Sequence, residues 1–454
     1  MNIQNSPIFS KILFFSMMLF SQEASCWNWS KANLSDPQFL QKLTFPKNFI
    51  FGVADSAYQT EGAEGPGGKL YENSWTRFEK ERNLVPAGKG CERWTRFKED
   101  IQLIKKSGFK IYRFSVEWSK IEPQPGVFNQ EAMDHYKDVC KELLTHNIIP
   151  VVCLFHHAWP CWFGDIDGFE KSKNNYYFIR YGTFVLRELA PYVTTWMTFN
   201  EPEGYAMQAY YRGHYPPAKK DMRLTGKVLK HMMQCHIELY QNAKKQNSKN
   251  QVGFAKIMQP VEPYSWYNPL EVLASSVANY LMDDCLLNFF STGIFNWSTV
   301  GINKVYYKDA RAKKSLDFLG VNYYTHTWLK NFSPKSKIDE VLSEDGKAVH
   351  PEGIYNSLKK CAKLKVPLYV AENGVSDSKD ILKEDYIKRH LYVISQACKD
   401  GIDIRGYFYW TLMDNFEWLQ AYNQCYGLYH VDRKTQKRTL RNGAKNFISY
   451  IQTR

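Results

Sequence analysis

The chain has 454 residues, of which 44% are hydrophobic and 23% are charged, a composition typical of a globular protein. Its net charge of +13 comes from lysines and arginines spread along the whole chain rather than from a basic block, which argues against nucleic-acid binding. Aromatic residues make up 16% of the chain, and both sugar-stacking surfaces and a large aromatic core use such residues.

The first 26 residues differ from the rest of the chain. One lysine precedes the apolar stretch 12–20, which is too short to cross a bilayer and is typical of the hydrophobic region of a signal peptide. Ala24 and Ser25 are small residues suited to a cleavage site, whereas Glu23 fits a lipoprotein site at Cys26 poorly. We therefore predict a signal-peptide leader over 1–26 and an exported protein. A cytoplasmic protein with a non-functional leader is the alternative, and no later segment reaches transmembrane length.

Eight apolar, strand-like runs follow, and helical patterns separate them. Continuous apolar strands are typical of parallel sheets that are covered on both faces. Eight such units predict one (β/α)8 TIM barrel, an α/β fold, as a single catalytic domain over 45–454. A doubly wound sheet is the alternative, but the chain lacks a G-x-G-x-x-G after the first strand and a P-loop. The predicted strands are 49–54, 111–116, 148–155, 192–199, 251–257, 316–324, 366–371 and 404–412.

Polar and aromatic residues accompany seven of these runs. The carboxyl ends of barrel strands form the active-site face, so these side chains are expected to converge on one mouth. A single polar strand end is ordinary, but seven together are harder to explain by solvation. The residues concerned are Gln59, Arg113, His156, His157, Asn200, Glu201, Asn322, Tyr323, Tyr324, Glu372, Asn373, Trp410, Asp414, Asn415, Glu417 and Trp418.

Two glutamates at this mouth, Glu201 and Glu372, suit glycoside hydrolysis. One carboxyl group must be protonated to assist the leaving oxygen, and the other must be ionised to attack the anomeric carbon. A separation of about 5–5.5 Å between them would predict a retaining mechanism. Arg113 and Tyr324 are the candidates to support an ionised nucleophile. Glu203, two residues after Glu201, is expected to be an ordinary acid of a loop or helix start.

The motifs resemble those of glycoside hydrolase family 1, the β-glucosidase/β-galactosidase family, from residue 45 to residue 432. "TFNEP" (198–202) resembles the acid/base motif of that family, which implies that Glu201 is the proton donor. "YVAENG" (369–374) resembles its nucleophile motif, which implies that Glu372 is the attacking carboxylate.

The resemblance also implies a sugar-binding site and no cofactor. Asn200 is similar to the donor to the sugar 2-hydroxyl, and Trp410 to the tryptophan under the sugar ring. Glu417 favours a neutral sugar, because family members that take 6-phosphosugars lack this carboxylate. The substrate-binding residues implied are Gln59, His156, Asn200, Asn322, Tyr324, Trp410, Glu417 and Trp418.

Lys347 departs from the family pattern, which has a tryptophan there on the leaving-group side of the site. We therefore expect a less aromatic and more basic aglycone side and an unusual leaving group.

The expected function is hydrolysis of the terminal non-reducing β-linked sugar of a glycoside by double displacement. A transglycosylase would use the same residues, and a binding-only protein usually lacks one of the two glutamates. The glycone, the natural aglycone and the oligomeric state stay open.

The ten cysteines are scattered, with no C-x-x-C pair and no Cys/His spacing typical of a zinc site. We therefore expect neither a disulfide scaffold nor a metal site. Cys153 lies in an apolar run and is predicted to be a small core residue.

Overall fold

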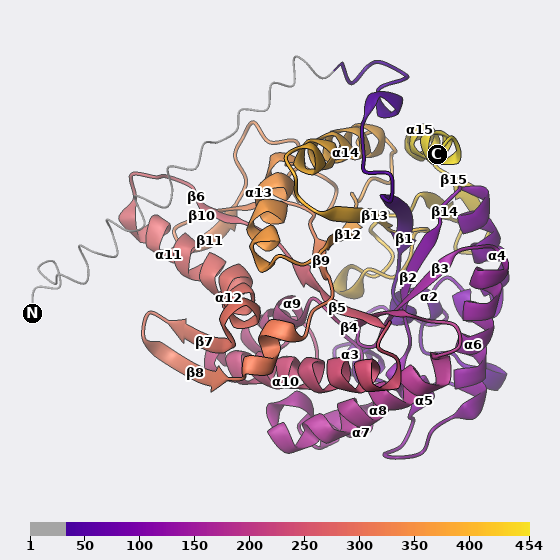
Figure 1. Cartoon of the computed structure of the whole chain (residues 1–454), viewed down its shortest axis with the longest axis vertical. Coiled ribbons are helices and arrows are strands. Elements are labelled where there is room, and N and C mark those ends of the chain that lie inside the picture. Colours follow the sequence, from indigo (N-terminus) through magenta and orange to yellow (C-terminus); the bar gives the residue numbers. More distant parts are fainter. Residues whose placement is uncertain (1–32) are drawn as a thin grey trace, which may run out of the picture.

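The computed structural model describes residues 33–454, and its centre is a closed barrel of eight parallel strands (Figure 1). The strand order is β1-β13-β12-β9-β5-β4-β3-β2, and the pairing of Ile50 with Gly406 and of Gly52 with Ile111 closes the ring. The predicted TIM barrel is confirmed, and the doubly wound alternative is wrong. The barrel strands are β1 (Ile50–Ala54), β2 (Ile111–Ser115), β3 (Ile149–Cys153), β4 (Thr195–Asn200), β5 (Gln251–Ile257), β9 (Leu319–Asn322), β12 (Leu368–Asn373) and β13 (Ile404–Trp410).

Most of the strands are shorter than the apolar runs that predicted them. The run 192–199, for example, becomes strand only at Thr195, because Tyr192 belongs to the turn that follows the preceding helix. Apolar residues beyond a strand pack as well as those inside it, so hydrophobicity does not mark the boundary.

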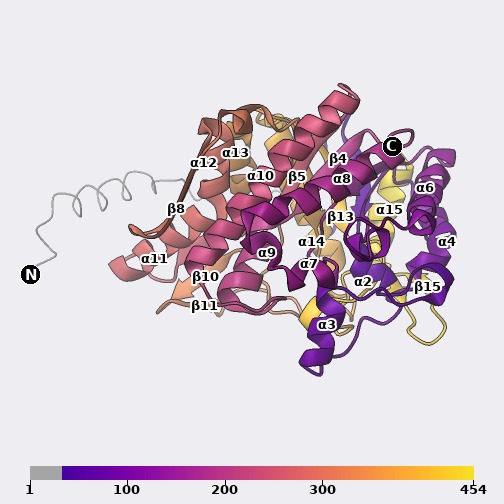
Figure 2. The same cartoon turned by 90° about the horizontal axis from the view of Figure 1, so that it is seen from below.

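Helices surround the barrel and cover its outer face (Figures 1 and 2). The longest one, α10, starts at the cap Asp221, whose carboxylate accepts a hydrogen bond from the backbone N–H of Leu224 at 2.9 Å. Its buried residues recur at helical spacing, so one face packs inward. The long helices are α4 (Arg93–Lys106), α6 (Gln130–Thr145), α8 (Asn175–Leu189), α10 (Met222–Gln246), α11 (Pro269–Asn279), α13 (Glu352–Cys361) and α14 (Lys383–Lys399); the shorter ones are α2 (Ala57–Glu61), α3 (Ser74–Glu81), α5 (Trp118–Ile121), α7 (Cys161–Asp165), α9 (Pro202–Ala206), α12 (Cys285–Thr292) and α15 (Lys445–Gln452).

A separate core fills the inside of the barrel. Cys153 lies in it with small and apolar residues such as Ala255 and Met197. Cys153 is buried, so the prediction of a core cysteine is confirmed. Its thiol is free, as are those of the other eight cysteines of residues 33–454.

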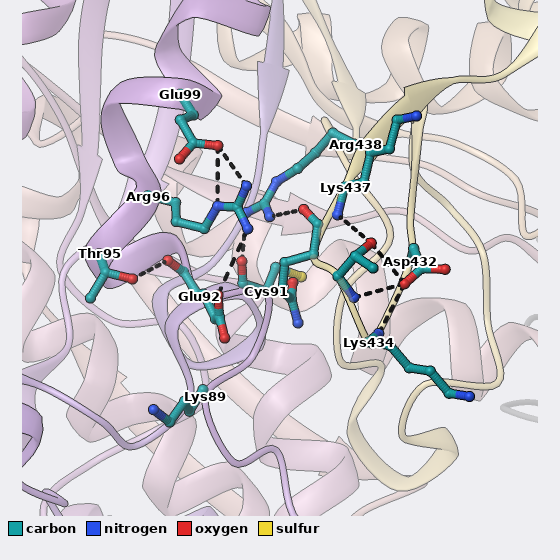
Figure 3. A network of polar contacts seen from close by, with 12 residues as sticks. Lys89, Cys91, Glu92, Thr95, Arg96, Glu99, Asp432, Lys434, Lys437 and Arg438 are labelled. Atoms are coloured by element: carbon teal, nitrogen blue, oxygen red, sulfur yellow. Dashed lines mark hydrogen bonds and ion pairs between the residues drawn. The ribbon is translucent and has the colours of Figure 1, made fainter.

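Three small sheets lie outside the barrel. β6 (Val261–Pro263), β10 (Thr327–Lys330) and β11 (Ser333–Lys335) form one, and β7 (Ile294–Thr299) pairs with β8 (Ile302–Lys308). β14 (Tyr429–Val431) pairs with β15 (Arg438–Leu440) near the end of the chain. Arg438 ties this hairpin to α4 and to the segment before it. Its guanidinium donates to the backbone carbonyl of Cys91 (Figure 3). It also donates to the carboxylate of Asp100 in α4.

The predicted leader, residues 1–26, lies outside the described residues. Within 33–454, no helix combines the length and the apolar character that crossing a bilayer requires.

Candidate active site

Glu372 lies near the end of β12, where two donors hold its carboxylate. Arg113 of β2 donates from Nη1 to Oε1 at 2.5 Å, and the hydroxyl of Tyr324 donates to Oε2 at 2.6 Å. Both Arg113 and Glu372 are buried, and charge-assisted hydrogen bonds are strong in such surroundings. Burial and the nearby negative charge of Glu372 hold the pKa of Tyr324 well above its usual value, so this phenol keeps the proton that it donates. The contacts therefore favour an ionised Glu372.

The backbone aims Glu201 into the mouth by leaving the strand at that residue. The pairing of β4 with β5 shifts register between Met197 and Asn200, and such irregularities re-aim side chains next to active sites. Glu201 itself has φ of +44°, a left-handed conformation that is uncommon for a residue with a side chain. Pro202 then begins α9, a position where its missing N–H costs no hydrogen bond.

The Glu201 carboxyl group has surroundings unlike those of Glu372. It accepts one hydrogen bond, from the Asn322 side-chain amide at 2.8 Å, and no cation contacts it among the described residues. Burial, and next the negative charge of Glu372, raise the pKa of Glu201 to about 8. Glu201 can therefore carry a proton at neutral pH beside an ionised partner.

Asn200 connects the two glutamates through a network of side chains. Its Oδ1 accepts from Arg113 Nη2 at 2.6 Å and from Asn322 Nδ2 at 3.0 Å. Its Nδ2 lies 3.0 Å from His156 Nε2, and burial keeps the pKa of His156 well below its usual value. The imidazole is therefore neutral, and since Nε2 accepts, Nδ1 carries the hydrogen.

Three buried polar atoms of this network lack a hydrogen-bond partner among the described residues. They are His156 Nδ1, Arg113 Nε and the side-chain oxygen Oδ1 of Asn322. Buried polar atoms are nearly always paired, so unpaired ones that cluster beside two carboxyl groups suit a ligand rich in hydroxyl groups.

The remaining predicted residues line a second side of the same site. Gln59 of α2 donates from Nε2 to Glu417 at 3.2 Å and to the backbone carbonyl of Phe416 at 2.8 Å. The His156 ring stacks with Trp410, with ring centroids 5.7 Å apart, and with Trp418, at 6.1 Å. Burial raises the pKa of Glu417 to about 7, against the opposing charge of Lys347. His156 thus joins Trp410 and Trp418 to the network around the two glutamates, and Gln59 and Glu417 contact each other beside them.

Glu203 lies at a helix start, as expected, but it is not an ordinary solvated acid. Glu203 is fully buried in the first turn of α9, where its carboxylate forms an ion pair with Lys256 of β5 at 2.9 Å. Lys256 also lies 3.7 Å from Asp283. The pair joins the segment after β4 to the neighbouring strand, a long-range contact that the local sequence around Glu203 does not reveal.

Sequence reasoning noted Lys347 but missed its partners. The Lys347 ammonium contacts the carboxylate of Asp345 and the hydroxyl of Tyr426, and it lies 5.3 Å from the ring centroid of Tyr324. Tyr426 also donates to Asp345. The surroundings of Lys347 are therefore less basic than expected, because Asp345 balances the charge of the lysine. Asp345 stands two residues from Lys347, and only this proximity could have pointed to it.

The described residues contain one group with the composition of a metal site, and it does not include the two central glutamates. It consists of Glu262, His326 and His350.

Comparisons with known proteins agree on one family. The model of the family described as Glycosyl hydrolase family 1 matches residues 41–454. Beta-glucosidase A of Acetivibrio thermocellus is 29% identical over 435 residues, which are 89% of this chain and 97% of that protein. A 6-phospho-beta-galactosidase of Staphylococcus epidermidis is 29% identical over 450 residues, which are 87% and 95% of the two chains. The solved structure of a beta-glycosidase from Pyrococcus horikoshii matches with a TM-score of 0.81 and 32% identity, over 90% of this chain and 95% of that one.

Proposed function

The chain belongs to glycosyl hydrolase family 1 and is a glycosidase, and from this premise we propose that it is a retaining, β-glucosidase-like enzyme. It removes the terminal non-reducing β-linked sugar of a glycoside by double displacement, with Glu372 as the nucleophile and Glu201 as the acid/base.

The observation that carries this proposal is the contrast between the two carboxyl groups. Glu372 accepts hydrogen bonds from a guanidinium and a phenol, whereas Glu201 is uncharged at neutral pH because burial and the charge of Glu372 raise its pKa. Two carboxyl groups whose surroundings separate their protonation states are the requirement for glycoside cleavage.

The reaction proceeds in two steps. In the first, Glu372 attacks the anomeric carbon while Glu201 gives its proton to the leaving oxygen, so the glycosidic bond breaks and a glycosyl ester forms. In the second, Glu201 takes a proton from a water molecule, whose oxygen attacks the same carbon and releases Glu372. Each step inverts the anomeric carbon, and the product retains the original configuration.

The glycone of this reaction is proposed to be a neutral sugar. The unpaired Nδ1 of His156 is a hydrogen donor for a hydroxyl group, and Gln59 and Glu417 supply further polar atoms. The Glu417 carboxyl group can hydrogen-bond a hydroxyl in either protonation state. Once ionised, as it is above about pH 7, it repels the phosphate that substrates of 6-phospho-beta-galactosidase relatives carry.

Two variants test the roles of the glutamates. Glu372→Gly should lose hydrolysis, and added azide should restore turnover and yield an α-glycosyl azide, because azide attacks in place of the carboxylate. Glu201→Ala should keep activity on substrates with good leaving groups and yield a β-glycosyl azide. Chromatography and NMR of the products distinguish the anomers. Full activity in both variants, or the opposite anomers, would contradict the assignment.

The substrate is tested by a panel of β-glucosides, β-galactosides, β-fucosides and their 6-phosphates with varied aglycones. The proposal expects neutral glycosides to react and 6-phosphates to react poorly. Lys347, where the family has tryptophan, favours a leaving group other than a simple aryl or cellobiose unit. An ordinary preference for cellobiose and aryl glucosides would contradict that part. Sugar-containing acceptors in the same assay show whether transglycosylation competes with hydrolysis.

Export is proposed from the apolar stretch 12–20 and the small residues that follow it. Fractionation of producing cells and N-terminal sequencing of the mature chain test it. A cytoplasmic protein that retains Met1 would contradict it.

A further inference from the structure

We propose that Glu262, His326 and His350 form a binding site for a late first-row divalent metal ion, with Zn²⁺ as the ion that fits best. This site is separate from the two glutamates of the proposed reaction, and nothing in the proposed function requires it. The three residues offer one ligand atom each, and these atoms all lie within 4.8 Å of one another.

The fold brings the three residues together from distant parts of the chain. Glu262 lies in β6, which follows barrel strand β5, and pairs with Trp328 of β10, two residues after His326. His350 lies just before α13, in the same connection as His326, which follows barrel strand β9. Connections that follow barrel strands lie on the carboxyl-end face. The ion would therefore join two such connections, and the wide spacing explains why no sequence motif revealed the site.

His326 has the surroundings of a metal-binding histidine. Its Nδ1 faces Glu262 Oε1 at 2.7 Å, and its Nε2 faces Glu340 Oε1 at 2.6 Å. Glu340 is itself held by the indole N–H of Trp328 at 2.7 Å and by the backbone N–H of Lys337 at 2.8 Å. A carboxylate that holds the far nitrogen of a histidine orients the ring and strengthens it as a ligand.

An ion inserted between His326 and Glu262 requires a small rearrangement. With metal–nitrogen and metal–oxygen distances of about 2.0–2.2 Å in tetrahedral geometry, the two ligand atoms would stand about 3.3–3.6 Å apart. The present separation of 2.7 Å must therefore widen by about 0.6–0.9 Å. The Glu262 side chain is 32% exposed, so it has room to move.

His350 must turn to join the ion. Its ring stacks on that of His326 with centroids 3.8 Å apart and planes 9° apart. A ligating lone pair lies in the plane of its ring, so two parallel stacked rings cannot both point at one ion. The His350 side chain is 29% exposed, and its Nδ1 contacts the Tyr323 hydroxyl at 3.2 Å, so one ring rotation exchanges that contact for the metal.

The donor set selects the class of ion. Two imidazole nitrogens and one carboxylate oxygen suit zinc and its late first-row neighbours, whereas calcium and magnesium prefer oxygen ligands alone. Three protein ligands leave the fourth tetrahedral position to water.

The test measures metal content and does not depend on glycosidase activity. The full chain without an affinity tag is stripped with EDTA and dialysed against ZnCl₂, CaCl₂ or MgCl₂, and bound metal is counted by mass spectrometry. We expect one Zn²⁺ per chain, no stoichiometric Ca²⁺ or Mg²⁺, and an apparent melting temperature that rises with zinc concentration.

Four variants make the test specific. Glu262→Gln and His350→Asn should lower zinc affinity at least tenfold, and Glu340→Gln should lower it by about 10–100-fold because it loosens His326. His146→Asn is the matched control. His146 follows α6 directly and pairs with Glu142 at 3.0 Å, outside this cluster. The His146→Asn variant should bind zinc like the unmodified chain. Circular dichroism and melting in EDTA check that each variant folds. Substoichiometric zinc in the unmodified chain would overturn the proposal. So would a zinc affinity of Glu262→Gln and His350→Asn equal to that of the unmodified chain.

Discussion

The proposed roles of Glu201 and Glu372 rest on the single side chains around each carboxyl group. Arg113 lies on the Glu372 side, and Asn322, a neutral amide, lies on the Glu201 side. The cation beside Glu372 favours its ionised form, whereas the neutral amide beside Glu201 offers no charge to do the same.

The raised pKa of Glu201 predicts the alkaline limb of the pH–rate profile. Glu201 must be protonated to act as an acid, so kcat/KM should fall as the pH rises through about 8. Steady-state kinetics from pH 5 to 10 with an alkyl glycoside, whose leaving group needs the proton, measure this limb. A dinitrophenyl glycoside, which needs no proton, is the control and should show a weaker fall. An equal fall for both substrates would assign the limb to another group.

Arg113 offers a second prediction at the level of one residue. It donates to Glu372 and to Asn200, so its planar guanidinium orders both sides of the network. Lysine keeps the charge but loses the forked geometry. Arg113→Lys should therefore lower kcat/KM by about 10²–10³-fold, the usual loss when one preorganised donor is removed. A loss below tenfold in a variant that melts like the unmodified enzyme would contradict this role.

Among the elements, β4 and β12 share one irregularity, a register shift just before Glu201 and Glu372. The pairing of β12 with β9 shifts register between Val370 and Glu372, as that of β4 with β5 does between Met197 and Asn200. A register shift turns the following side chains away from the regular alternation. In both strands the register shift therefore changes the direction in which the glutamate side chain points, compared with a regular strand.

The buried ion pair of Glu203 and Lys256 links α9 to β5, the strand that pairs with β4. Removing Glu203 leaves the buried Lys256 charge with only the more distant carboxylate of Asp283, at 3.7 Å. Glu203→Ala should therefore lower the free energy of unfolding by about 3 kcal/mol, the lower end of the usual loss when a buried pair is broken. The double variant Glu203→Gln/Lys256→Met removes both charges and should lower the free energy of unfolding by clearly less than Glu203→Ala does. Urea denaturation measures both.

The matched control for this pair is Asp403→Asn. Its ion pair with Arg405 is about half exposed on both sides and should change the free energy of unfolding by at most about 1 kcal/mol. Equal losses for Glu203→Ala and Asp403→Asn would show that the Glu203–Lys256 pair adds little.

The sequence allowed the eight strands and the contacting cluster of site residues to be predicted because each depends on local patterns. Apolar runs mark strands, and residues such as Glu201 and Glu372 stand directly at their ends. The partner of Glu203 is 53 residues away, and Glu262, His326 and His350 meet only after folding. Contacts of this kind depend on how strands and connections pack, which local patterns do not contain.

For the whole molecule, buried histidines and buried carboxyl groups make stability depend on pH in opposite ways. Burial lowers the pKa of four histidines to about 3 or 4, so the unfolded chain takes up protons first as the pH falls. These are His135, His157, His236 and His390. Burial raises the pKa of four acids to between about 6 and 8. As the pH rises, these acids therefore lose their protons at a higher pH in the folded chain than in the unfolded chain. These are Asp55, Glu79, Glu201 and Glu417.

The two groups act in separate pH ranges at either side of an optimum. Above about pH 6.5 unfolded histidines are already neutral, so the four acids dominate and stability falls as the pH rises towards 8. One buried lysine, Lys383, opposes this fall near pH 8, because burial lowers its pKa to about 8. Below about pH 4 unfolded acids are protonated as well, so the histidines dominate, and stability falls with the pH. We therefore expect the melting temperature to peak between about pH 5 and 6.5.

Calorimetry at constant ionic strength from pH 3 to 8.5 tests this profile. Glu79, which accepts from the Tyr58 hydroxyl at 2.8 Å outside the catalytic network, gives the diagnostic variant. Glu79→Gln removes one late-releasing acid and should make the alkaline fall shallower, whereas the exposed Glu131→Gln should leave the slope unchanged. A melting temperature that still rises between pH 6.5 and 8 would contradict the raised pKa values of these acids as a group.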